Sequence, residues 1–212
     1  MLTQQFQQAL TECPLIAIIR GVKPTEVEAV AETLLEEGVR IIEIPLNSPE
    51  PLKSLELLAR RMEGRGLCGA GTVLTTAEVS AVKNAGGQLI ISPNCNPDVI
   101  KATLAAELMS LPGCLTPTEI FSAIAAGADH IKLFPAGDLG TSYVASLFGP
   151  LPKNITTLAV GGIDEHNMAA YWQAGTRGFG LGSNLYQAGD NVEQIRVKAR
   201  TLMAAARQLP RG

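Results

Sequence analysis

The chain has 212 residues, of which 46% are hydrophobic and 17% are charged, and its net charge at pH 7 is −3. This length suits one domain, spanning residues 1–212, with a sizeable core, and the composition excludes a disordered chain. There is no basic excess, so nucleic acid is not expected as a partner.

The four cysteines are scattered and form no C-x-x-C pair. This indicates free thiols in a reducing compartment. The chain does not open on a basic segment followed by a long apolar stretch, and no apolar run is long enough to cross a bilayer. We therefore expect a cytoplasmic protein without a membrane partner.

Apolar strand-like runs alternate with amphipathic helix-like stretches. Residues 2–11 are predicted to form an extra helix that plugs the bottom of the fold. A strand over Leu15–Ile19 leads to a helix with Thr25 as its N-cap and Glu28 in a capping box. The later strands are predicted over Val39–Ile44, Leu67–Ala70, Gln88–Ser92, Glu107–Leu111, His130–Phe134, Ile155–Val160 and Arg177–Leu181, and the last helix over Val192–Gln208.

A weak internal repeat supports this organisation. Gly38, Gly86, Gly127 and Gly175 each stand between a helical stretch and a strand, where glycine is favoured because it adopts the left-handed conformation at little cost. About eight such units fit the chain, which predicts an α/β fold of the (β/α)8 TIM barrel type with an extra N-terminal helix. The alternative is an open doubly wound sheet, but its G-x-G-x-x-G fingerprint is missing after the first strand.

Lys132 is the most informative residue. It lies in a buried strand, on the face that also carries His130 and Phe134. Burial lowers the pKa of a lysine, and a neutral amine can attack a carbonyl to form a Schiff base. The alternative is a structural lysine whose amine reaches solvent from the strand end.

The active site of a barrel lies at the carboxyl ends of its strands. Glu43, near the end of the second strand, is the natural partner of Lys132, because Schiff-base chemistry needs a general acid and base. A buried ion pair without catalysis is the alternative. Arg20, after the first strand, is predicted to bind a carboxylate or phosphate rather than to be a surface arginine.

Glycines follow the last two predicted strands. Gly161-Gly162 and Gly182-Ser183 offer backbone N–H groups that can approach a phosphate closely. Tight turns without a ligand are the alternative. His130 and His166 lack the spacing of metal ligands, so neither a metal site nor another cofactor is expected.

An ordered set of short segments resembles the KDPG/KHG aldolase family from about Leu15 to Gly189. The segments are Ile18-Ile19-Arg20-Gly21, Glu43-Ile44-Pro45-Leu46-Asn47-Ser48, Gly69-Ala70-Gly71-Thr72-Val73-Leu74, Ser92-Pro93-Asn94, Ile131-Lys132-Leu133-Phe134-Pro135, Ala159-Val160-Gly161-Gly162 and Leu181-Gly182-Ser183.

The resemblance implies a metal-free class I aldolase on a (β/α)8 barrel, forming a homotrimer. Its substrates would be a phosphorylated sugar acid and pyruvate. It also implies roles for the residues: Lys132 as the Schiff-base lysine and Glu43 as the proton shuttle, with the other groups binding substrate. Those groups are Arg20, Thr72 and Pro93 at the pyruvate carboxylate, Phe134 beside the lysine, and Gly161, Gly162, Gly182 and Ser183 at the phosphate.

Two positions bear on the C4 epimer. Val160 stands where the phosphogluconate-cleaving relatives tend to carry threonine, and Asn47 where they tend to carry arginine. Both favour 2-dehydro-3-deoxy-6-phospho-D-galactonate as the substrate. The alternatives are the gluconate epimer or 4-hydroxy-2-oxoglutarate, a phosphosugar isomerase or epimerase on a similar barrel, and a non-catalytic phosphosugar sensor.

Overall fold

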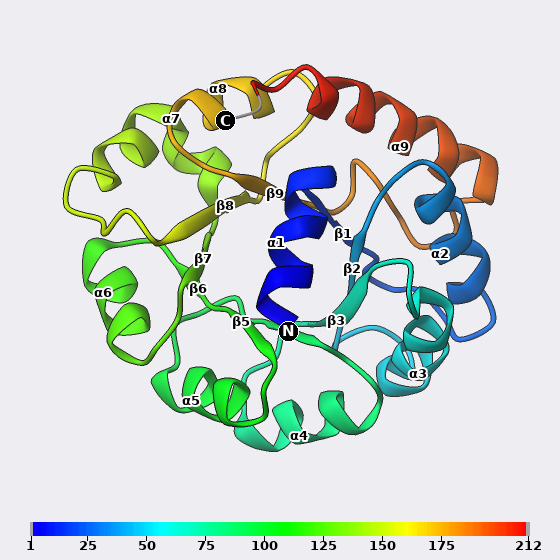
Figure 1. Ribbon diagram of the computed structural model, residues 1–212. Helices are drawn as coiled ribbons and strands as arrows, with labels where there is room; N and C mark the ends of the chain where they lie inside the picture. The colour runs from blue at the N-terminus through cyan, green and yellow to red at the C-terminus, as the bar shows by residue number, and fades with distance from the viewer. Residues whose placement is uncertain (1, 211–212) are drawn as a thin grey trace.

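The computed structural model describes residues 2–210, and its parallel strands form a ring enclosed by helices (Figure 1). Among these residues, no helix has both the length and the apolar character needed to cross a membrane. The strands are β1 Leu15–Ile18, β2 Ile41–Pro45, β3 Leu67–Gly71, β4 Leu89–Ile91, β5 Met109–Leu111, β6 Gly113–Cys114, β7 His130–Leu133, β8 Thr156–Val160 and β9 Gly178–Leu181. The helices are α1 Leu2–Glu12, α2 Val27–Glu36, α3 Pro51–Met62, α4 Thr76–Asn84, α5 Pro97–Ala105, α6 Pro117–Ala125, α7 Ala136–Leu147, α8 Met168–Gln173 and α9 Val192–Arg207.

Pro112 links the two outer strands of the sheet and so completes the ring. The strand order is β5-β4-β3-β2-β1-β9-β8-β7-β6, so its two outer members are consecutive in the sequence. β5 pairs with β4, β6 pairs with β7, and only Pro112 separates β5 from β6. Because proline has no N–H for a ladder, the fifth strand of the barrel is split in two. The predicted (β/α)8 barrel is confirmed, and the open doubly wound sheet is wrong.

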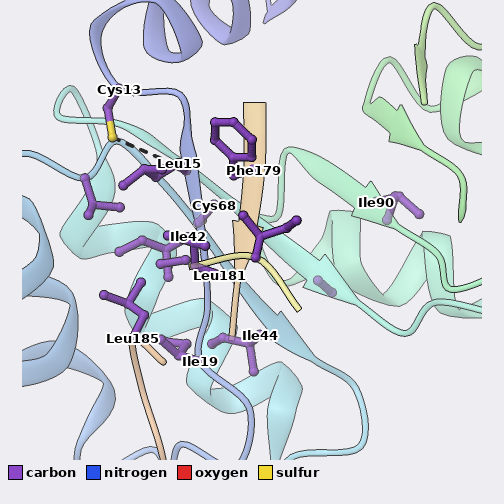
Figure 2. Close-up of a cluster of buried hydrophobic side chains, with 14 of the residues drawn as sticks. Cys13, Leu15, Ile19, Ile42, Ile44, Cys68, Ile90, Phe179, Leu181 and Leu185 are labelled. Carbon is purple, nitrogen blue, oxygen red and sulfur yellow. Dashed lines mark hydrogen bonds between the residues drawn. The ribbon is translucent and has the colours of Figure 1, made fainter. Parts of the chain in front are cut away.

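Side chains alternate between two apolar layers along each strand, because successive residues of a strand point to opposite faces. On β7, Ile131 and Leu133 join the outer layer between strands and helices, which Figure 2 shows in part. His130 and Lys132 point into the barrel, where His130 contacts Phe6 of α1 and Lys132 lines an interior cavity. The predicted shared face of His130 and Lys132 is therefore confirmed.

Helix α1 covers the amino-terminal end of the barrel, as Figure 1 shows at the centre of the ring. Phe6 is fully buried in the interior cluster, together with residues of β1 to β5 and β8. Its ring meets that of His130 edge to face, with the centroids 5.0 Å apart. The predicted plug is confirmed, and it closes the barrel to solvent at one end.

Helix boundaries test the capping predictions. Four glycines were predicted to end helices, and all four have a positive φ between 85° and 119°: Gly38, Gly86, Gly127 and Gly175. Thr25 is not an N-cap: α2 starts later, with Glu26 at the N-cap position and no side-chain cap. Backbone bonds to Lys23, from the amides of Glu26 and Val27, form the turn before the helix instead.

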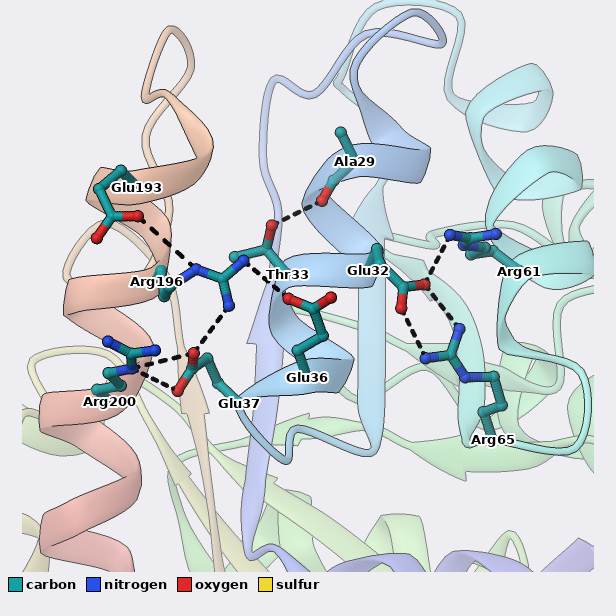
Figure 3. A network of polar contacts seen from close by, with 10 residues as sticks. All are labelled: Ala29, Glu32, Thr33, Glu36, Glu37, Arg61, Arg65, Glu193, Arg196 and Arg200. Carbon is teal, nitrogen blue, oxygen red and sulfur yellow. Dashed lines mark hydrogen bonds and ion pairs between the residues drawn. The ribbon is translucent and has the colours of Figure 1, made fainter.

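Ion pairs join neighbouring helices around α2 (Figure 3). Glu37 accepts from Arg196 and Arg200 of α9, at 3.0 Å each. Glu32 pairs with Arg61 of α3 and with Arg65, at 2.8 and 2.7 Å. Because α9 is the last helix and α2 belongs to the first β/α unit, the Glu37 pairs connect the two ends of the helical ring.

The fold predicts a large cost for truncating the plug. Phe6→Ala leaves a cavity in a closed interior, so we expect the free energy of unfolding to fall by about 3 kcal/mol. Urea denaturation measures this change. Gln5→Ala, an exposed position one residue away on α1, serves as the control. Equal stability of the two variants would contradict the plug's role in the core.

Candidate active site

A cavity of about 560 Å³ opens at the carboxyl ends of β1, β7, β8 and β9. Seven of the predicted site residues line it: Arg20, Phe134, Val160, Gly161, Gly162, Gly182 and Ser183. A narrow cavity lined by Glu43 and Lys132 lies in the barrel, and the two cavities share Ile18, Val160 and Gly180. The charged pair therefore lies next to the floor of the open cavity.

Lys132 is held by β7 and is 8% exposed. Gly113 of β6 pairs with Lys132 in the sheet. The Lys132 Nζ lies 4.6 Å from the centroid of the Phe134 ring. Within residues 2–210 no carboxylate oxygen lies within 4.0 Å of that nitrogen, so the predicted alternative of a direct Glu43–Lys132 ion pair is not what the structure has. Burial lowers the pKa of Lys132, and the charge of Arg20 lowers it further, while the charge of Glu43 opposes this.

Glu43 is 2% exposed on β2 and faces the same interior. Burial raises the pKa of its carboxyl group to about 7, against the opposing effects of Lys132, Arg20 and the Gly71 amide. Its Oε2 is buried without a hydrogen-bond partner among the described residues. A carboxyl group that is close to half ionised at neutral pH and has a free oxygen is suited to take up and release protons.

Gly71 makes room for the Glu43 carboxylate. A Cβ built on Gly71 would collide with both oxygens of that carboxylate. Gly71 ends β3, and its carbonyl accepts the Leu46 amide at 2.8 Å. The strand end is thus glycine because a carboxylate occupies the space of a side chain.

Arg20 lies in the loop after β1 and is tied to the loop after β2. Its guanidinium Nη1 donates to Asn47 Oδ1, and the Gly21 amide donates to Ser48 Oγ at 2.9 Å. The side chain is exposed, yet its charge lowers the pKa of both Glu43 and Lys132. Arg20 therefore acts on the two buried groups through its charge, and its role in binding a carboxylate or phosphate stays a prediction.

Thr72 and Pro93 follow β3 and β4 at the same end of the barrel, but neither lines the two cavities. Thr72 has φ 58°, in the left-handed region where a β-branched residue is an outlier. Such strain costs roughly 1–3 kcal/mol and clusters at functional sites. The binding roles of Thr72 and Pro93 stay predictions.

Asp164 lies in the turn before α8. Its carboxylate accepts the amides of His166 and Asn167, at 2.9 and 3.0 Å. Asn167 occupies the N-cap position of α8 without a side-chain cap to that helix. Asp164 therefore caps the turn that precedes α8 and is not the N-cap of the helix itself.

Sequence reasoning missed four residues that shape this end of the barrel. Ser48 and Gly71 belong to the segments that carry the family resemblance, but no role was predicted for them or for Asn167 and Asn184. A polar side chain one or two residues after a strand-end glycine was the available signal for Asn184. The described residues contain no group of three or more histidine, cysteine or acidic side chains arranged to hold a metal ion.

The chain is similar to proteins of one family over nearly its whole length. The family model for KDPG and KHG aldolases matches residues 6–199. A protein of Rhizobium meliloti (strain 1021) named "Probable 2-dehydro-3-deoxy-6-phosphogalactonate aldolase" is 46% identical over 194 residues, 92% of each chain. The "2-dehydro-3-deoxy-6-phosphogalactonate aldolase" of Escherichia coli (strain K12) is 40% identical over 198 residues, 93% of this chain and 97% of that one.

Solved structures agree with these matches. One described as "Native KDPGal structure" superposes with a TM-score of 0.91 at 40% identity, over 93% of this chain and 96% of that chain. A cube-shaped protein cage designed by fusing symmetric oligomeric domains superposes with a TM-score of 0.90, also at 40% identity, over 92% of this chain and 72% of that chain.

The electrostatics of the site predict the effect of removing Arg20. Because its positive charge lowers the pKa of both Glu43 and Lys132, we expect Arg20→Met to raise both. Carbon-13 NMR of glutamate carboxyl groups over a pH series measures the Glu43 pKa, with Glu43→Gln to identify the signal. Arg60→Met, which removes an exposed charge that acts on neither group, is the control. An unchanged or lower Glu43 pKa in Arg20→Met would refute this account.

Proposed function

The chain belongs to the KDPG and KHG aldolase family, and we propose that it cleaves 2-dehydro-3-deoxy-6-phospho-D-galactonate reversibly to pyruvate and D-glyceraldehyde 3-phosphate through a Schiff base on Lys132. One observation carries the proposal. A buried lysine and a buried glutamate share the interior of a barrel directly beneath a cavity lined by two glycine-rich strand ends.

Lys132 would act as the nucleophile. At an ordinary pKa near 10.4, only about one lysine in a few thousand is neutral at pH 7. Burial lowers the pKa of Lys132 and so increases the neutral fraction. Its Nζ attacks the C2 ketone of the substrate to give a carbinolamine, and loss of water gives a protonated imine that draws electrons from the neighbouring bond.

Glu43 would move the protons. The ionised carboxylate takes the proton of the C4 hydroxyl group, directly or through water, and the C4 oxygen becomes the aldehyde oxygen. The electrons of the C3–C4 bond pass to the imine and form an enamine. Return of a proton to C3 gives the pyruvyl imine, and its hydrolysis releases pyruvate and the free amine. A pKa of about 7 lets one carboxyl group serve both directions near neutral pH.

The remaining predicted residues would hold the two ends of the substrate. Arg20, with Thr72 and Pro93, would bind the carboxylate end, and Phe134 would pack beside the imine. Gly161, Gly162, Gly182 and Ser183 would receive the phosphate. Arg20 and the glycine-rich loops line one cavity, which supports their binding of one substrate, whereas the roles of Thr72 and Pro93 rest on the family resemblance.

The choice of epimer rests on the relatives and on two residues. Both relatives described above carry the galactonate name, and Val160 lines both cavities, where it can contact the substrate. Asn47 engages Arg20 instead of offering a positive charge of its own. Such a preference depends on one or two hydroxyl contacts, each worth a few kcal/mol. The gluconate epimer and 4-hydroxy-2-oxoglutarate are the alternative substrates.

We also propose a homotrimer. The designed cage whose fused units are symmetric oligomers contains a domain similar to this chain, which supports an oligomer of this fold. Cleavage of this substrate would place the protein in galactonate catabolism, and the cytoplasmic location stays a prediction.

Trapping with pyruvate tests the covalent step. We expect borohydride reduction in the presence of pyruvate to add one reduced pyruvyl group to the wild type, measured by intact mass. Lys132→Ala should gain none, because it lacks the amine. Exposed Lys53→Ala is the matched control and should be labelled like the wild type. No adduct on folded wild type would sink the Schiff-base proposal and favour a phosphosugar isomerase or epimerase.

Comparison of the two epimers tests the substrate. We expect a higher kcat/KM for pyruvate release from the phosphogalactonate substrate than from the phosphogluconate substrate. A coupled reduction of the released pyruvate measures both rates. Val160→Thr should narrow the ratio, because a hydroxyl group then faces the substrate. A higher kcat/KM for the gluconate epimer in the wild type would reverse the assignment.

A further inference from the structure

Three consecutive carbonyl groups of the loop after β8 each accept a hydrogen bond. The Gly161 carbonyl accepts from the Gly137 amide at 2.8 Å. The Gly162 carbonyl accepts from Asn167 Nδ2 at 2.7 Å, and the Ile163 carbonyl accepts from Asn184 Nδ2 at 2.8 Å. Two side-chain amides, from different loops, therefore fix the orientation of adjacent peptide units.

Holding a carbonyl group also fixes the amide of the next residue. The C=O and N–H of one trans peptide plane point in opposite directions. With the carbonyls of Gly161 and Gly162 engaged, the N–H groups of Gly162 and Ile163 point away from Gly137 and Asn167. The backbone hydrogen bonds of residues 2–210 include none donated by these two amides, and both residues line the open cavity. Successive free amides of this kind bind anions.

Asn167 is itself held in one orientation. Its side-chain Oδ1 accepts a hydrogen bond from the backbone N–H of Asp164 at 3.0 Å. The backbone N–H of Asn167 donates to Asp164 Oδ1, also at 3.0 Å. Because the oxygen is engaged by an N–H donor, the Nδ2 must face the Gly162 carbonyl. Among the described residues that line the cavity, Asp164 carries the one acidic group, and its carboxylate is occupied by two amides.

Asn184 connects the two glycine-rich loops. It follows Gly182-Ser183 directly, and its Nδ2 reaches the Ile163 carbonyl in the loop after β8. The turn around it is set by the Gly182 carbonyl, which accepts the amides of Leu185 and Tyr186 at 2.9 Å each. The position of Ser183 relative to Gly162 thus depends on one side-chain amide.

We propose that Asn167 and Asn184 are positioning residues for the phosphate dianion of a phosphorylated substrate. Asn167 aims the amide of Ile163, beside the Gly162 amide that Gly137 aims, and Asn184 holds the loop of Ser183 next to them. This inference rests on the proposed function and deepens it. Each Nδ2 group donates one of its two hydrogens to a backbone carbonyl, and the role proposed here is to hold that carbonyl. Their contribution is therefore selectivity for a phosphorylated over an unphosphorylated substrate.

Two variants remove the donors. Asn167→Asp keeps the acceptor for the Asp164 amide and loses the donor to Gly162, and Asn184→Leu keeps the size of the side chain and loses its donor. Asn154→Asp and Asn154→Leu are the matched controls, because Asn154 is exposed before β8, at the opposite end of the barrel. Thermal unfolding of each variant separates loss of the fold from loss of phosphate selectivity.

The readout is a ratio of two aldol additions of pyruvate, to D-glyceraldehyde 3-phosphate and to unphosphorylated D-glyceraldehyde. We expect kcat/KM for the phosphorylated aldehyde to fall about tenfold in each variant, as the loss of oriented charge-assisted hydrogen bonds implies. The rate with D-glyceraldehyde and the pyruvate adduct should match the wild type. Equal losses with both aldehydes, or an unchanged ratio of the two kcat/KM values, would overturn the proposal. The two asparagines would then only stabilise the loops.

Titration with inorganic phosphate decides the matter even if the aldolase proposal fails. Isothermal titration calorimetry should show weaker phosphate binding by Asn167→Asp and Asn184→Leu than by the wild type and both Asn154 variants. Binding equal to the wild type would overturn the positioning role. Failure of the pyruvate adduct on the wild type would instead count against the proposed function, and the two results are independent.

Discussion

Removal of Lys132 and Glu43 from water is the constraint on which the site depends. Desolvation disfavours the charged form of each group, so it lowers the pKa of the amine and raises that of the acid toward neutrality. A close ion pair would oppose both shifts, but among residues 2–210 no carboxylate oxygen lies within 4.0 Å of the Lys132 nitrogen, although Glu43 lines the same interior cavity. The plug helix contributes to this, because Phe6 seals the amino-terminal end against solvent.

In the proposed reaction, chemistry and recognition come from different parts of the molecule. The strands carry the two titrating side chains, each in a fixed register within a ladder of hydrogen bonds. The loops beyond them carry Arg20 and the glycine-rich segments, held by side chains such as Asn47 and Asn184. Loops held on a rigid barrel can change their substrate contacts without disturbing the lysine below them.

Much of the fold and part of the site could be predicted from the sequence. The barrel, the plug and the helix-ending glycines followed from local patterns. The shared face of His130 and Lys132 followed from strand alternation, and the pairing of Lys132 with Glu43 followed from their places near strand ends. Thr25 was wrong as an N-cap because backbone bonds to Lys23 form the first turn. The split of the fifth strand at Pro112, the left-handed Thr72 and the bonds of Asn167 and Asn184 depend on tertiary partners that no local pattern contains.

The placement of the chain ends has a consequence for engineering. Leu209 and Pro210 line a hollow with Gln7 and Pro14, so the last described residues lie at the plugged end of the barrel. The open cavity lies at the opposite end. A tag, a surface anchor or a second enzyme joined next to Pro210 would therefore lie at the end of the barrel opposite the open cavity. The plugged end of the barrel is therefore suited to attachment, while the end with the open cavity stays accessible.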